Sequence, residues 1–204
     1  VSVVLTDGFE FDVSLGRLHA SLSELRDESA KQAAVVATVD EFMAMVAVPK
    51  LSAETLEYLY PVIAAANPLL IVSMQQLEAA SRQEVAPGLA SYLVLRRGVR
   101  TVYLTEADIS GSGFAEAVLR DQAIANLRAT LAKLEFKELS VDPWVAQIGL
   151  DGLLNVAVML LPEVWNDLTA KHGQVAVACP EFGTLLVTEV GSAEAMEFLR
   201  QNSV

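Results

Sequence analysis

Side chains suited to catalysis are sparse in this chain of 204 residues, which has two histidines and one cysteine. Cys179 and His172 are the only nucleophile and base that lie close in the sequence. A thiol hydrolase needs these two side chains within about 3 Å of each other, with an oxyanion hole beside them. The run VAVAC that ends at Cys179 is typical of a buried strand, and no cationic residue lies within five positions of it. We therefore expect an inert thiol.

A second group of polar residues lies in the segment FAEAVLRDQAIANLRATLAKL, residues 114–134. Its apolar residues recur three and four positions apart, which predicts a helix with one buried stripe. The stripe consists of Leu119, Ala123, Ile124, Leu127, Leu131 and Leu134. Glu116 and Arg120 interrupt it in the first turn, although a dry core disfavours both charges. They either pair with each other at the rim of the domain, or line a polar recess with Asn126 that a ligand or partner completes. The candidate binding residues are Glu116, Arg120 and Asn126.

The common cofactor and metal motifs are not found. Gly111-x-Gly113 precedes the helix, but Glu116 stands where the dinucleotide fingerprint needs Gly or Ala, and its carboxylate would repel a pyrophosphate. The sequence contains no Walker spacing, no HExxH, no GxSxG and no paired histidines at metal-ligand spacing. Asp7, Glu10 and Asp12 are hard-cation ligand types, yet strand alternation explains the last two as a solvent face. We expect no cofactor, no metal site and no recognisable catalytic residues.

Composition and charge restrict the partners. The chain has 26 acidic and 14 basic residues, and its net charge of −12 disfavours nucleic acids and anionic lipid surfaces. Hydrophobic residues make up 53% of the chain, enough for a packed core, and no apolar run is long enough for a membrane span. The single cysteine favours a reducing compartment such as the cytoplasm. The start at Val1 leaves open that an upstream segment, including a targeting one, has been removed.

The local patterns predict hairpins and helices in a single domain, residues 1–204. The first half is expected to contain a hairpin over 1–13, a helix that begins at Ser14 and a second helix that runs to about Met45. An edge strand over 56–65 with Pro61, a weak helix over 75–87 and a hairpin over 91–105 are expected to follow. A loop over 106–113 leads to the central helix. The second half is expected to contain a strand over 143–148, a helix over 162–172, strands over 175–179 and 184–190, and a helix over 193–200. The apolar run over 153–161 is a strand by composition or a helix by length, and periodicity does not decide between them; we choose a helix. The fold class is α+β, a mainly antiparallel sheet with helices packed on one face, and the alternative is an α/β doubly wound sheet.

The order of four sequence motifs resembles a known family. YPVIAA at 60–65, RDQAIANL at 120–127, GLDGLLNVAVMLLPEVW at 149–165 and VAVACPEFGTLLV at 175–187 are similar to the YtpQ-like family of uncharacterised bacterial proteins, a domain of unknown function. The resemblance covers about Tyr60 to Val190. Arg120, Asn126 and Leu127 match the pattern of the family, whereas Ala64 stands where a basic residue is common. The resemblance implies no activity.

The leading functional hypothesis is a soluble, non-catalytic module that binds a protein or peptide partner. Catalytic groups are few, and hairpins leave sheet edges available for an added strand. The alternative is an enzyme, a hydrolase with an unrecognised active site, for which Cys179 with His172 or the acidic groups near Asp108 are the candidates. Apolar surface patches would favour the module, and a deep pocket with convergent polar groups would favour the enzyme.

Overall fold

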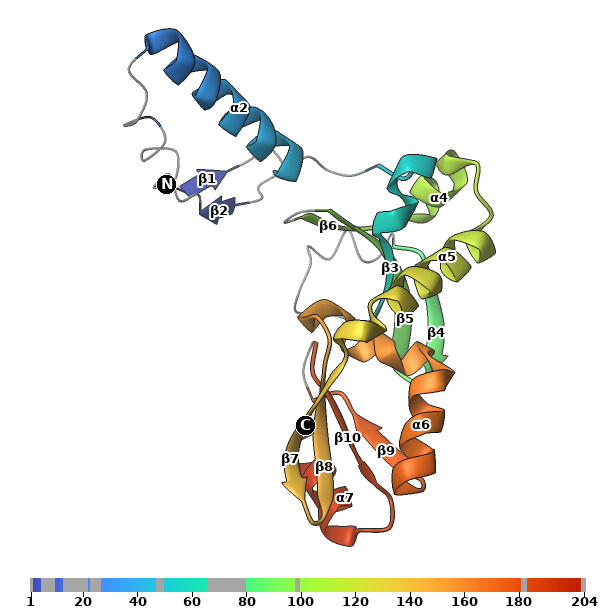
Figure 1. Cartoon of the computed structure of the whole chain (residues 1–204). Coiled ribbons are helices and arrows are strands. Elements are labelled where there is room, and N and C mark those ends of the chain that lie inside the picture. Colours follow the sequence, from blue (N-terminus) through green and yellow to red (C-terminus); the bar gives the residue numbers. More distant parts are fainter. Residues whose placement is uncertain are drawn as a thin grey trace. The chain divides into compact units, whose positions relative to one another are not determined.

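The computed structural model describes residues 2–4, 10–12, 22, 27–46, 50–65, 80–97, 100–180 and 183–202 (Figure 1). Contacts between residues divide the chain into two compact units, Val1–Ala47 and Val48–Val204. The single domain expected over 1–204 stays a prediction beside this division of the contacts.

The first unit contains a short hairpin and a long helix. Strands β1 (Ser2–Val4) and β2 (Glu10–Asp12) pair antiparallel, with Val3 opposite Phe11, so the predicted hairpin is confirmed. Helix α2 (Glu28–Val46) is the second of the two helices predicted here. Asp27 caps its start by accepting hydrogen bonds from the backbone N–H groups of Ser29 and Ala30. The helix predicted from Ser14 lies outside the described residues, apart from the helical Leu22.

The second unit begins with a four-stranded antiparallel sheet. Strand β5 (Leu89–Arg97) pairs with β3 (Leu59–Ala65) on one side, and with β4 (Arg82–Ala86) and β6 (Arg100–Tyr103) on the other. Among the described strands β3 lies at an edge, as the presence of Pro61 predicts. Helix α5 (Glu116–Ala129) packs against β3 and the 3₁₀ helix η1 (Ala53–Tyr58). Helix α4 (Glu106–Ser112) precedes α5.

A second four-stranded antiparallel sheet follows in the order β7-β8-β10-β9. Its strands are β7 (Glu135–Val141), β8 (Trp144–Gly149), β9 (Val175–Ala178) and β10 (Leu185–Glu189). Two 3₁₀ segments, η3 (Gly152–Leu154) and η4 (Val156–Leu160), lead into α6 (Pro162–His172), and α7 (Ala193–Gln201) packs on β10 and β9. The fold class is therefore α+β with antiparallel sheets, as predicted, because every pair of named strands is antiparallel.

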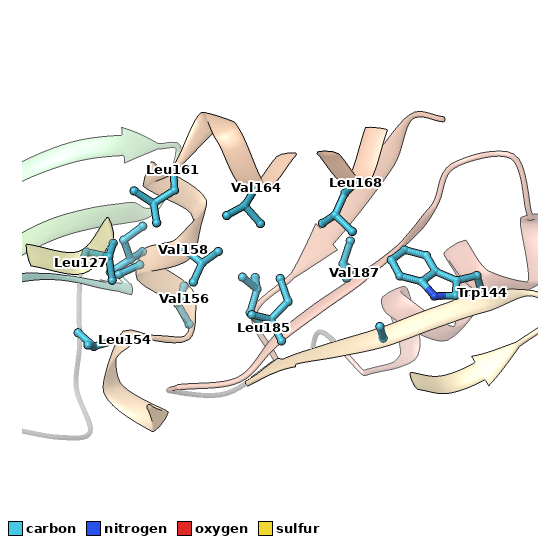
Figure 2. Close-up of a cluster of buried hydrophobic side chains, with 14 residues drawn as sticks. Leu127, Trp144, Leu154, Val156, Val158, Leu161, Val164, Leu168, Leu185 and Val187 are labelled. Carbon is cyan, nitrogen blue, oxygen red and sulfur yellow. The ribbon is translucent and has the colours of Figure 1, made fainter. Parts of the chain in front are cut away.

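The main core of the second unit joins its two sheets. Figure 2 shows Val164 and Leu168 extending from α6 towards Leu185 and Val187 of β10. Leu127 of α5 belongs to the same cluster, whereas Leu119 and Ala123, earlier on that helix, belong to a cluster under the first sheet. All three α5 side chains are fully buried. These three members of the predicted stripe form a buried face, whereas Ile124 is partly buried, and Leu131 and Leu134 are partly buried beyond the end of α5 at Ala129.

Several local predictions are wrong. Residues 82–86, predicted within a weak helix, form β4, because pairing with β5 across the turn at Gly88 (φ +78°) overrides a weak local preference. The predicted loop over 106–113 contains α4, which a capping box between Thr105 and Asp108 begins. Strand β7 was not predicted. For 153–161 the choice of a helix over a strand is confirmed, but the segment forms the two 3₁₀ helices η3 and η4 and not an α-helix.

The strand and helix predictions near the C-terminus are confirmed. Strands β9 and β10 and helix α7 lie where expected, and Pro162 occupies the first turn of α6. Gly173 ends α6 with φ +74°, a conformation that favours glycine. In the part of the chain that the structure describes, no helix combines the length and the apolar character needed to cross a membrane.

Candidate functional site

Glu116 and Arg120 form an ion pair in the first turns of α5. The Glu116 Oε1 atom accepts hydrogen bonds from Arg120 Nε at 3.0 Å and from an Arg120 terminal nitrogen at 2.6 Å. Ser81, which precedes β4, donates from Oγ to the same carboxylate oxygen at 2.8 Å. The side chain of Arg120 is 17% exposed and that of Glu116 is 47% exposed. The predicted pairing of the two charges at the rim is confirmed, and Ser81 is a partner that the sequence does not reveal.

The charge on Glu116 is stabilised by these contacts. The Arg120 guanidinium first, and the Ser81 hydroxyl second, hold the pKa of Glu116 below its ordinary value. Both partners donate hydrogen bonds to the carboxylate, and these are stronger when the group is ionised. The group is therefore satisfied within the chain and does not need a ligand to complete it.

Asn126 has a structural role two turns further along α5. Its side-chain nitrogen donates to the carbonyl oxygens of Leu56 at 2.7 Å and Leu59 at 2.8 Å, and its oxygen accepts from Gln122 at 2.8 Å. These bonds tie α5 to the end of η1 and the start of β3. The structure thus brings Glu116 and Arg120 together but directs the Asn126 amide to the backbone of another segment.

The acidic candidate Asp108 is also accounted for by local structure. Its carboxylate accepts hydrogen bonds from the backbone N–H of Thr105 at 2.8 Å and from the Thr105 hydroxyl at 2.6 Å. The Thr105 hydroxyl accepts in return from the N–H of Asp108. This reciprocal arrangement is a capping box, which stabilises the start of α4.

Cys179 and His172 have different neighbours. The Cys179 Sγ atom lies 3.9 Å from the Met159 sulfur, and burial raises the pKa of the thiol. A nucleophilic cysteine needs the opposite change, because the thiolate is the reactive form. The His172 ring stacks on Trp144, with ring centroids 3.7 Å apart and planes 11° from parallel. Among the described residues, its Nε2 is the buried side-chain polar atom that lacks a hydrogen-bond partner.

The stacked pair lies at one side of an open cleft of 630 Å³ between α6 and β7. Leu131 and Leu134, which follow α5, and Phe136 of β7 line the cleft together with Trp144 of β8. Val164 and Leu168 of α6, which Figure 2 shows in the core cluster with Leu168 nearer to Trp144, complete the apolar lining. Charged groups at the cleft are Glu138, Glu163, Asp167 and Lys171. This mainly apolar hollow with a few polar groups has the size and composition of a ligand site.

The free edge of β7 lies beside this cleft. Strand β7 pairs with β8 alone among the described strands, so its outer backbone groups have no neighbouring strand. In the register, Phe136 is opposite Ile148 and Glu138 is opposite Ala146, which places both on the side of the sheet that faces the main core. Phe136 is 38% exposed, and Leu139 and Val141 of the same strand are also exposed. An edge strand with exposed apolar side chains is a place where another chain can pair.

Sequence reasoning missed this cleft because β7 was not predicted. The segment EFKELSV carries Phe136, Leu139 and Val141, whose spacing is broken by an irregular pairing between Glu138 and Ser140. With one residue fewer at this irregularity, the three apolar residues would stand two positions apart, as in a regular strand. None of Glu116, Arg120 and Asn126 lines the cleft.

No metal centre accompanies the cleft: the described residues contain no group of three or more His, Cys, Asp or Glu side chains suited to hold an ion. Comparison of the chain with known protein families, with curated proteins and with solved structures finds no match in any of the three.

Proposed function

We propose that the Val48–Val204 unit is a non-catalytic module that binds an extended segment of a protein or peptide partner. The partner segment lies beside β7 and places one large apolar side chain in the cleft between β7 and α6. The observation that carries this proposal is the coincidence of an open apolar cleft with a free strand edge.

The chemistry of the site supports this mode of binding. Main-chain hydrogen bonds to the β7 edge supply affinity for any extended segment, and a pocket next to the edge selects one side chain in every two. The partly exposed Phe136 and the half-buried Leu131 and Leu134 provide apolar surface that a partner would remove from water. A thiol hydrolase is less well supported, because the Cys179 pKa is raised and Cys179 does not line the cleft with His172.

The proposal is tested by selecting peptides from a random display library on the immobilised full chain and measuring their affinity by fluorescence anisotropy. We expect the selected peptides to share a large apolar residue. Phe136→Ala should weaken them about tenfold, since a central apolar contact of this kind contributes more than about 1 kcal/mol.

Leu139→Ala is the matched control, because Leu139 is exposed on the same strand but does not line the cleft. It should leave the affinity within about twofold of the original chain. A library that yields no binders, or binders that are insensitive to Phe136→Ala, would refute the proposed site.

A further inference from the structure

The charged residues at the cleft indicate what kind of partner it accepts. Glu163, Asp167 and Lys171 are spaced four residues apart on α6, so they form one line along the helix face at the cleft. Glu138 of β7 lies on the opposite wall. The lining thus contains three carboxylates and one ammonium group.

Not all of these charges are equally available to a ligand. Arg128 of α5 forms an ion pair with Glu163 and lowers the pKa of that carboxyl group. Glu138, Asp167 and Lys171 have no ion-pair partner within the described part of the chain. Two unpaired carboxylates, Glu138 on β7 and Asp167 on α6, therefore lie on opposite walls of the cleft, and the one unpaired ammonium group, on Lys171, lies one turn beyond Asp167.

From this arrangement we propose, building on the binding function above, that the partner is a basic segment in which a large apolar residue is flanked by Lys or Arg. The apolar residue occupies the floor formed by Trp144, Phe136 and Leu168, and a flanking cation lies between Glu138 and Asp167. The net charge of −12 on the whole chain adds a longer-range attraction for such a segment.

Lys171 limits where the cation binds. It lies one turn beyond Asp167, next to His172 at the C-terminal end of α6. A cation of the partner is repelled beside Lys171 and attracted between Glu138 and Asp167. Lys171→Glu should therefore increase the preference for basic peptides, which a cleft without charge selectivity would not show.

To test this proposal, the peptides selected on the full chain are sequenced, and the selection is repeated on the double variant Glu138→Lys/Asp167→Lys. We expect Lys or Arg next to the apolar residue in the first pool, about tenfold weaker binding of these peptides to the double variant, and neutral or acidic peptides in the second pool. Raising the NaCl concentration should weaken the binding of the first pool of peptides to the original chain more than the binding of the second pool to the double variant.

The control carries the same change in total charge away from the cleft. Glu54 and Asp121 are exposed and do not line it, so Glu54→Lys/Asp121→Lys should retain the basic preference. Equal loss of binding in both double variants would show that the net charge of the chain, and not the cleft, selects basic peptides.

The experiments distinguish a wrong inference about the basic partner from a wrong binding site. Peptides that depend on Phe136 but are neutral or acidic would overturn the basic-partner inference and leave the binding site intact. An absence of selected peptides would remove both. A dimer in sedimentation analysis that Phe136→Ala dissociates would identify a second copy as the occupant and overturn the basic partner.

Discussion

The polar group at the start of α5 and the cleft between α6 and β7 differ in how completely the chain itself satisfies them. On α5, the Glu116 carboxylate receives hydrogen bonds from Arg120 and from Ser81, 35 residues away in the sequence. At the cleft, Phe136 remains 38% exposed and the outer edge of β7 has no neighbouring strand among the described residues. Folding thus supplies partners for the charged residues on α5, whereas the cleft leaves apolar surface and a strand edge exposed.

The largest expected loss of unfolding free energy separates a core residue of α5 from a residue that lines the cleft. Leu127 is fully buried in the cluster that joins the two sheets, so Leu127→Ala should lower the free energy of unfolding by about 2–5 kcal/mol. Leu131 is only partly buried at the cleft, so Leu131→Ala should cost clearly less. Chemical denaturation of both variants checks this order. Equal losses would mean that the cleft wall is as tightly packed as the core.

Asn126→Ala is the next most damaging change. It leaves the carbonyl oxygens of Leu56 and Leu59 without their side-chain donor, which we expect to cost about 1–3 kcal/mol of unfolding free energy. Gln122→Ala is the control, because it removes only a donor to the Asn126 oxygen. Peptide affinity should be unchanged in folded Asn126→Ala protein. Weaker binding without loss of stability would restore Asn126 as a ligand residue.

The Trp144–His172 stack gives a prediction at the cleft itself. His172→Phe keeps an aromatic ring on Trp144 and removes the unpartnered Nε2 atom, so stability should be maintained or increased. His172→Ala removes the stack and should lose about 0.5–1.5 kcal/mol beyond the effect of the smaller side chain. Thermal unfolding compares the two variants. A destabilised His172→Phe protein would show that the imidazole has a polar role.

The smallest stability effect is expected at the ion pair on α5. Arg120→Met should change the free energy of unfolding by a few tenths of a kcal/mol, since the Glu116 side chain is about half exposed. The pKa of Glu116 should rise towards its ordinary value, because its main hydrogen-bond donor is lost. The lowered pKa in the folded chain means that this contribution is present at neutral pH and is lost as the pH falls through it. Carbon-13 NMR titration of Glu116 measures the change, and an unaltered pKa in the variant would contradict the assignment.

The sequence predicts the elements whose signals are local. The apolar spacing over 114–134, Pro162 at the start of α6 and Gly173 after its end are read from neighbouring residues. The structure confirms all three, but α5 ends at Ala129 and a 3₁₀ helix (Leu131–Lys133) follows it. Strand β4 lacks such a signal, because its conformation depends on pairing with β5.

The candidate site is harder to predict for the same reason. The partner of Glu116 lies 35 residues away and those of Asn126 lie 70 and 67 residues away. The cleft combines residues from α6, β7, β8 and the segment after α5, and β7 is irregular between Glu138 and Ser140. No spacing along the chain identifies a surface that forms only when these four segments pack together.

The affinity of one selected peptide for the original chain, Phe136→Ala and Arg120→Met tests the central claim most directly. If the cleft is the binding site, Phe136→Ala should weaken the peptide about tenfold and Arg120→Met should leave its affinity unchanged. Weaker binding in Arg120→Met with full affinity in Phe136→Ala would place the site at the start of α5 and contradict this account.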